Sequence, residues 1–186
     1  MPQPTVTPIN IHVGRGDVYI GVSVPAEGST VPLTNGAPAD GRSIGATLAP
    51  CVFMYRPTTF DILTQQSTGI VGYVVTEEDV RMEFEIGELT YQNLKDMFVT
   101  PKPQATFVSI GGLIVPVIQS ALIVAPRRGG GFIEAMIYTA AFTEARDMSF
   151  NRAGAMSIKV VARAQALLTR SYGDQLGFVA PVIINQ

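Results

Sequence analysis

Apolar and charged residues alternate without interruption from Asp79 to Ile86. A period of two places the two kinds of side chain on opposite faces of an extended chain. We therefore expect a strand here. Its dry face would carry Val80 and the apolar residues in step with it, and its charged face would carry Glu83 and Glu85.

Several other stretches combine β-branched or aromatic residues with turn residues at their ends, which is typical of strands. They are Asp17–Val22, Cys51–Tyr55, Phe60–Gln65, Leu113–Val124, Phe132–Ala145 and Met156–Leu168. Arg56-Pro57 is expected to separate the second from the third, and the glycine-rich stretch 127–131 is expected to form a turn. The alanine-rich end of the last stretch is also compatible with a helix, but its period of two favours a strand.

One short helix is predicted from Tyr91 to Phe98. Thr90 can cap its first turn, apolar residues follow at helical spacing, and Pro101 stops it. A helix of about two turns is too short to be stable alone. Its apolar stripe is therefore expected to pack on a sheet.

These elements predict a mainly β fold, either a β-sandwich or a rolled β-barrel, with long antiparallel strands and one short flanking α-helix. The 186 residues suffice for a single domain over residues 1–186. Three segments lack a clear period: an N-terminal arm at Met1–Gly16, a long loop at Ser23–Gly45 and a C-terminal tail at Gly177–Gln186. A strand of a dozen residues spans about 40 Å, which suits a wall built from many copies.

The composition favours a surface that neighbouring subunits cover. Apolar residues make up 47% of the chain and charged residues 15%, with a net charge of −2. Typical domains carry about 25% charged residues. The near-neutral charge also gives no electrostatic reason to expect tight binding to nucleic acid or to an anionic membrane.

Residue types for the common catalytic and metal centres are scarce. Cys51 is the only cysteine, which excludes an internal disulfide and a Cys-based zinc site. His12, the only histidine, lies in the proline-rich N-terminal arm, so an ordinary exposed or interface histidine is favoured over the base of a Ser-His-Asp triad. The acidic group Glu77–Asp79, with Glu83 and Glu85, is compatible with a hard cation or a carboxylate pair, but a solvated strand face is the ordinary interpretation. We therefore expect no cofactor, no metal and no enzymatic activity.

Signals for export or membrane insertion are not expected from the pattern of the chain. The first residues lack a basic region followed by an apolar one. The apolar stretch Gly111–Pro126 is interrupted by polar residues and is shorter than the roughly 20 residues of a membrane-spanning helix. The single cysteine is typical of a reducing compartment.

The succession of segments is more informative than any single motif. A GDVYI strand at Gly16–Ile20 leads into the long Gly/Pro loop, then into Gly45-Ala46-Thr47 with CVFMY close behind. FDILTQQSTG follows, VRMEFEIGELT runs straight into the short helix, and the last long strand reads SIKVVARAQALL. This order, above all over Val80–Phe98, resembles the major tail tube proteins of long-tailed bacteriophages. The inner tubes of contractile injection machines and of type VI secretion are similar.

The resemblance implies a structural protein of the virion tail, made and assembled in the host bacterial cytoplasm. It implies hexameric rings that stack into a hollow tube, through which DNA leaves the capsid. The implied partners are further copies of the chain, the tail terminator, tape measure and baseplate or tip proteins, and transiting genomic DNA that is not bound specifically. No membrane partner is implied.

Two sets of candidate residues follow from this interpretation. A lumen through which DNA slides needs a negative or mixed lining, because phosphate neutralisation would hold the DNA in place. The lumen candidates are Glu83, Glu85, Glu134 and Glu144. Contacts between rings are expected from the N-terminal arm, the long loop and the C-terminal tail, as segments that become ordered on docking. The loop candidates are Gly28, Asn35, Gly36, Asp40 and Arg42.

Alternatives of two kinds remain open. Another virion component, such as a head decoration or connector protein, would differ in its place in the particle. A β-sandwich module that binds carbohydrate or a host receptor would be a monomer or trimer with an exposed concave patch. The absence of tryptophan argues mildly against sugar binding.

Overall fold

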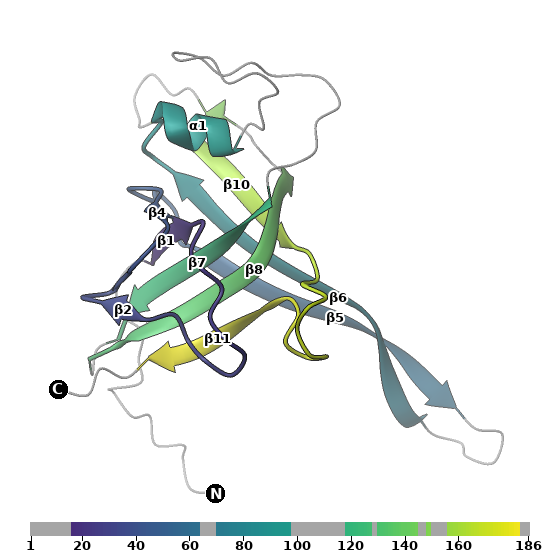
Figure 1. Ribbon diagram of the computed structural model, residues 1–186. Helices are drawn as coiled ribbons and strands as arrows, with labels where there is room; N and C mark the ends of the chain where they lie inside the picture. The colour runs from purple at the N-terminus through teal and green to yellow at the C-terminus, as the bar shows by residue number, and fades with distance from the viewer. Residues whose placement is uncertain are drawn as a thin grey trace, which may run out of the picture.

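A computed structural model of the protein describes residues 16–63, 70–97, 118–127, 130–144, 148–149 and 156–182. Within these ranges the fold is mainly β, with a large antiparallel sheet, a small sheet and one short helix (Figure 1). The predicted fold class is thereby confirmed. The predicted N-terminal arm up to Arg15, including His12, lies outside the described residues.

The large sheet contains nine of the described strands, in the order β4-β1-β7-β8-β10-β6-β5, with β11 beside β8 and β9 beside β10. Their bounds are β1 Asp17–Ile20, β4 Arg42–Ser43, β5 Val52–Leu63, β6 Ile70–Ile86, β7 Ile118–Pro126, β8 Phe132–Glu144, β9 Met148–Ser149, β10 Ser157–Ala164 and β11 Gly177–Val182. The small sheet pairs β2 (Leu33–Thr34) with β3 (Ala37–Pro38), and the helix α1 spans Tyr91–Met97.

The large sheet curls, so that strands far apart in its order face one core. Val18 of β1 and Phe84 of β6 belong to the same buried cluster, which we call the first core, although β7, β8 and β10 lie between their strands. The segment after β4 reaches across to β6. Leu48 N–H donates to Glu85 O at 3.0 Å, and Gly87 N–H donates to Ala46 O at 2.9 Å. The sheet is thus rolled, but its described strands do not close into a barrel.

The first part of the segment 22–45 covers the opposite face of β7 and β8 and forms a second core, while its end rejoins the sheet as β4 and places Ile44 in the first core. Val22 and Val31 are buried there against Leu122, Met136 and Tyr138. Because these apolar side chains need burial, the segment lies as a layer on its own subunit. This corrects the expectation that Ser23–Gly45 is a loop that becomes ordered only on docking.

Strand β6 confirms the predicted alternation, since Val80, Met82, Phe84 and Ile86 are all buried and the charged residues between them are half-buried. Strand β10 is shorter than predicted and ends at Ala164. After it the chain turns back, with Leu167 N–H donating to Gln175 O at 2.9 Å. Leu168 is consequently 82% exposed rather than part of a dry strand face.

Two segments that were expected to lie outside strands belong to strands in the structure. Strand β5 runs through Arg56-Pro57, because among the described strands it pairs with β6 alone, and a proline without an N–H is tolerated at such an open edge. The predicted tail from Gly177 begins as β11, which pairs antiparallel with β8 through Val182. Residues 183–186 lie outside the described part of the chain.

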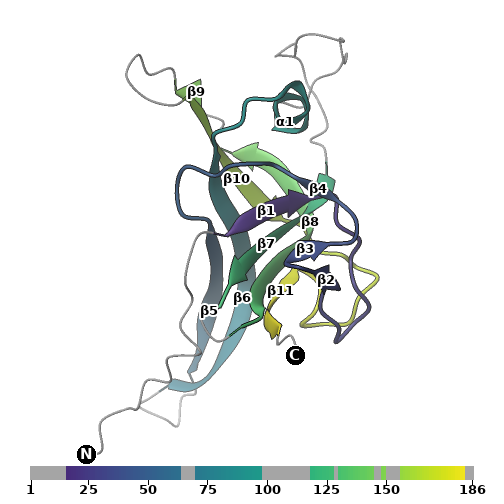
Figure 2. The same cartoon turned by 90° about the vertical axis from the view of Figure 1, so that its left-hand side faces the viewer.

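The helix has the predicted start and the predicted cap. Asn93 N–H donates to Thr90 Oγ1 at 3.2 Å, which satisfies one of the free N–H groups of the first turn. Met97 is buried in the first core, and Leu94 packs against it. Both views place α1 at one end of the molecule and the far ends of β5 and β6 at the other (Figures 1 and 2).

Candidate interaction surface

The longest hairpin of the sheet extends beyond the body of the protein. Pairing of β10 with β6 stops where Arg163 lies opposite Arg81. From there, residues 56–63 and 70–79 pair with each other and, among the described strands, with no other. We call this hairpin, residues 56–63 and 70–79, the arm; it is distinct from the predicted N-terminal arm. It projects away from the body in both views (Figures 1 and 2).

The outer half of the arm, residues 59–62 and 70–75, exposes apolar side chains on both faces. Phe60 lies opposite Val74 in the register, and Tyr73 lies opposite Asp61 on the other face. Phe60 and Tyr73 are each 66% exposed. The other large exposed hydrophobic residues of this half are Ile62, Ile70, Val71, Val74 and Val75. An apolar patch of this size without cover is typical of an interaction site.

The acidic residues at the base of the arm are engaged by nearby side chains. Asp79 lies between Arg81, whose Nε donates at 2.7 Å, and Arg163, whose Nε lies 3.3 Å away. The hydrogen bond from Arg81 is the main reason that the pKa of Asp79 is lowered. Tyr55 Oη donates to Glu78 Oε1 at 2.7 Å. The described residues contain no group of three or more His, Cys, Asp and Glu that could hold a metal ion.

A hollow of about 330 Å³ lies between the base of the arm and the segment 172–179. The hollow has Phe53, Tyr55 and Val80 on its sheet side, and Tyr172, Leu176, Phe178 and Val179 on the other. None of its described lining residues is a lysine or an arginine, and its single carboxylate is Glu78. Its lining therefore suits apolar groups and offers no cation to a phosphate.

Arg170 holds the outer wall of the hollow against the second core. Its guanidinium lies 4.1 Å above the ring of Tyr138, which favours a cation–π contact. Nη1 of Arg170 donates to Pro25 O at 2.9 Å, and Nη2 lies 2.9 Å from Asp174 Oδ2. Asp174 also accepts a hydrogen bond from Tyr138 Oη. These contacts fix the segment that leads into Leu176 and β11.

Most of the loop residues predicted to join rings make contacts within the subunit. Asn35 and Gly36 form the β2–β3 turn with φ values of 52° and 82°, as expected for a two-residue hairpin turn. A Cβ at Gly36 would lie 2.6 Å from the Phe132 ring. Asp40 Oδ2 accepts a hydrogen bond from Ser23 N–H at 3.0 Å. Gly28 is exposed, and a Cβ added to it would meet no described atom within 4 Å. Whether any of them contacts another ring stays a prediction.

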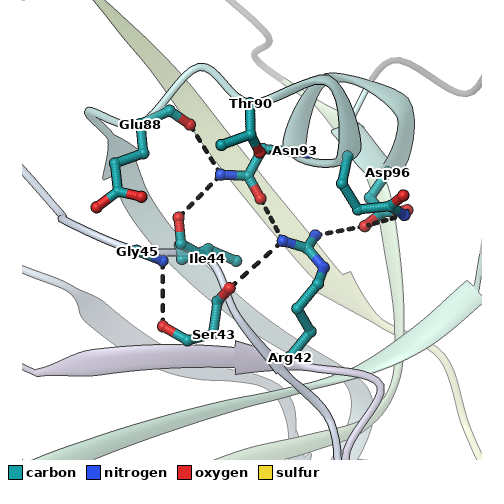
Figure 3. A network of polar contacts seen from close by, with 9 residues as sticks. Arg42, Ser43, Ile44, Gly45, Glu88, Thr90, Asn93 and Asp96 are labelled. Carbon is teal, nitrogen blue, oxygen red and sulfur yellow. Dashed lines mark hydrogen bonds and ion pairs between the residues drawn. The ribbon is translucent and has the colours of Figure 1, made fainter. Parts of the chain in front are cut away.

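Arg42, the fifth of these residues, anchors the helix to the sheet (Figure 3). Its guanidinium pairs with Asp96 and donates to the side-chain oxygen of Asn93. The amide of Asn93 in turn donates to Ile44 O at 2.9 Å and to Glu88 O at 2.8 Å. Arg42 therefore has a structural role inside the subunit, which the sequence pattern did not indicate.

The four lumen candidates differ in their environments. Glu83 and Glu85 lie on the polar face of β6, where Lys159 Nζ is 3.9 Å from Glu83 and Ser157 donates a hydrogen bond to Glu85. Which polar face lines a lumen stays a prediction. The prediction that Glu134 lies on a surface is wrong, because this residue is fully buried in the second core. The side chain of Glu144 lies outside what the structure describes.

The exposed residues of the arm were missed by the sequence analysis. The apolar surplus of the composition predicted surface for burial by neighbours, but it did not say where. The local signal is the run Ile70–Val75, which has no alternation and no charge. Such a run is as typical of a buried strand as of an exposed ribbon, so only the structure locates the surface.

No protein-family model and no curated protein matches this chain. The described residues contain no helix long and apolar enough to cross a membrane.

Proposed function

We propose that the protein is a structural subunit that assembles with copies of itself, as the tube subunit of a bacteriophage tail. The observation that carries this proposal is the arm, which exposes apolar side chains on both faces of a two-stranded ribbon. A hairpin without further strands is at best marginally stable in water. The arm is therefore expected to function when it lies on another molecule.

Two further features support a repeating assembly. Among the described strands, β5 pairs only with β6 and β11 pairs only with β8, so each offers an unpaired edge. These two edges belong to segments that lie far apart in the chain. Contacts between unlike surfaces of identical subunits are head-to-tail, and they generate rings when the rotation closes and filaments when it does not.

The step from assembly to a tail tube rests on the order of elements. The rolled sheet, the charged-and-apolar strand β6 and the helix that follows it occur in the order that resembles tail tube proteins. In such a tube the half-buried carboxylates Glu83 and Glu85, mixed with Lys159, are candidates for a lining that does not retain DNA.

Electron microscopy and sedimentation of the purified protein test this proposal. We expect rings or hollow tubes from the native chain, and monomers from the double variant Phe60→Ser/Tyr73→Ser with an unchanged melting temperature. Leu168→Ser is the matched control, because it removes an even more exposed apolar residue away from the arm. Monomers of the native chain at every concentration, even with tail-assembly partners, would contradict the proposal.

A second candidate is a binding module for a carbohydrate or a receptor, which the aromatic lining of the hollow favours. Tyr172 is 99% exposed beside Tyr55 and Phe178, and exposed rings can stack on sugars. Glycan binding by a monomer that is lost in Tyr172→Ala would favour this function. Assembly that is unaffected by Tyr172→Ala, without glycan binding, would count against it.

A further inference from the structure

We propose that the outer half of the arm of one subunit occupies the hollow of the next subunit. This rests on the proposed self-assembly and names the two surfaces that carry it. One surface is the apolar ribbon at residues 59–62 and 70–75, and the other is the hollow between Tyr55 and Val179.

The arm cannot fill the hollow of its own subunit. Tyr55, Glu78 and Val80 at its base already form one wall of the hollow. From this wall the arm leads away from the body in both views (Figures 1 and 2). The far ends of β5 and β6 lie away from the body in both views (Figures 1 and 2), so an outer half that fills the hollow has to come from another molecule.

The chemistry of the two surfaces matches. The outer half of the arm carries one charged residue, Asp61, and its other large side chains are apolar or aromatic. The hollow is lined mainly by apolar and aromatic residues and has no lysine or arginine among its described lining residues. A nucleic acid or another polyanion finds no cation there, whereas a ring such as Tyr73 or Phe60 finds an apolar cover.

The size of the hollow agrees with a side-chain anchor. Its volume of about 330 Å³ lies at the lower end of the range of small-ligand pockets. That space suits one or two large side chains. Anchors of this kind, aromatic residues in a preformed pocket, carry most of the energy in many interfaces.

The backbone at the hollow offers a second kind of contact. Strand β11 forms part of the outer wall through Gly177, Phe178 and Val179, and among the described strands its outer edge is unpaired. The arm also has an edge, from Thr58 to Leu63 of β5, that no other described strand pairs with. An arm lying along β11 would add strands to the sheet of its neighbour while its side chains fill the hollow.

Each subunit then gives one arm and receives one arm. Because the donor and acceptor surfaces differ, a head-to-tail contact of this kind propagates from copy to copy, whereas a reciprocal exchange of arms would close a pair. The ring of the proposed tube would therefore be held by a series of identical arm-in-hollow contacts.

Disulfide trapping between two differently labelled chains tests this inference. In a Cys51→Ser background, chains with Tyr73→Cys are mixed with chains with Val179→Cys and oxidised. We expect a covalent heterodimer from this mixture, and a ladder of higher species from a chain that carries both substitutions. Leu168→Cys in place of Val179→Cys is the control, because Leu168 is exposed but does not line the hollow.

A blocking variant gives an independent test that needs no oxidation. Val179 is 58% exposed, so Val179→Arg should leave the fold intact while it places a charge in the path of the arm. We expect the protein concentration needed for assembly to rise at least tenfold in this variant, and we expect Leu168→Arg to assemble like the native chain.

The outcomes separate this inference from the proposed function. If rings or tubes form but Tyr73→Cys and Val179→Cys do not cross-link, the arm-in-hollow contact is overturned and self-assembly still stands. Normal assembly of Val179→Arg would have the same meaning. Monomers of the native chain under all conditions would overturn both. Cross-linking as strong with Leu168→Cys as with Val179→Cys would also contradict the inference.

Discussion

The carboxyl group of Glu134 is buried and only partly satisfied by hydrogen bonds from the described residues. Its side chain is fully buried, Oε2 accepts a hydrogen bond from Val31 N–H at 3.0 Å, and Oε1 has no described hydrogen-bond partner. Burial raises the pKa of Glu134 above its ordinary value of 4.5, although the Val31 hydrogen bond opposes the shift. The folded protein therefore favours the protonated acid.

This shift predicts a stability that falls as the pH rises. Above pH 4.5 the unfolded chain loses the Glu134 proton while the folded chain still holds it, so the free energy of unfolding decreases until the raised pKa is passed. Glu134→Gln should remove this slope and stabilise the protein above that pKa, because the amide has no charge to bury. Its carbonyl oxygen can still accept the Val31 hydrogen bond.

Urea unfolding of dilute protein across a pH series measures the effect. Asp61→Asn is the control, because Asp61 is an exposed carboxylate on the arm. An unchanged pH slope in Glu134→Gln would show that another group causes the dependence.

Glu134 also shows what a strand pattern can and cannot predict about one residue. Phe132, Met136 and Tyr138 lie on the same face of β8 as Glu134, and all three are apolar or aromatic. The period of two therefore argued for a buried position. Glu134 was instead predicted to line a lumen because it is acidic. Charge alone cannot identify a surface where the rest of the face needs cover.

At the scale of elements, local patterns predicted the strands and the helix better than they predicted their partners. The alternation in β6 and the Thr90 cap of α1 are local, and both are confirmed. The continuity of β5 through Pro57 depends on its place at the edge of the sheet. The pairing of β11 with β8 depends on a strand about forty residues earlier in the chain. Such tertiary relations have no signal within a short window.

The contact between α1 and β4 was missed for the same reason. Asn93 and Asp96 are polar, yet both are buried, and Arg42, about fifty residues earlier, completes their hydrogen bonds. The cap residue could be predicted from three neighbouring positions, whereas this anchor required the fold.

The anchor predicts a strong coupling between Arg42 and Asp96. Arg42→Ala leaves a carboxylate that is 7% exposed with the Gln92 amide as its remaining described partner. We expect a loss of about 1–3 kcal/mol in the free energy of unfolding. In a double-mutant cycle, Asp96→Ala should cost much less in the Arg42→Ala background than in the native chain.

Thermal or urea unfolding of the four chains measures this coupling. Lys159→Ala is the control, because its ion pair with Glu83 is exposed and such pairs contribute about 0–1 kcal/mol. Additive effects of the Arg42 and Asp96 substitutions would contradict the anchor.

At the scale of the whole molecule, the apolar surplus is divided between two cores and the arm. The segment 22–45 uses part of it to cover the sheet, so a deletion within this segment should unfold the subunit and not simply block assembly. The arm holds the part that remains exposed. Composition predicted that such a surplus exists, while its location depends on how far β5 and β6 outrun β10.

Assembly through the arm should show the signature of apolar burial. Hydrophobic association weakens on cooling and strengthens with excluded salts such as sulfate. We therefore expect the concentration needed for assembly to rise on cooling and to fall with ammonium sulfate. Sodium chloride should change it little, since the outer arm has one charged residue.

Light scattering of concentration series at several temperatures and salts checks this expectation. Arm-independent effects are separated by the Phe60→Ser/Tyr73→Ser variant. If the assemblies dissociate progressively as sodium chloride is added, ionic contacts rather than the apolar arm hold the subunits together.

The proline in the middle of β5 has a consequence for the life of the free subunit. A long strand with an unoccupied edge can nucleate cross-β growth when many newly made copies are present together. Pro57 withholds one N–H from that edge, and bulges interrupt the register near Thr58 and Ile62. Fibril-like stacking is thereby frustrated along the ribbon, while the short run from Thr59 to Ile62 between the two register shifts stays available to a specific partner.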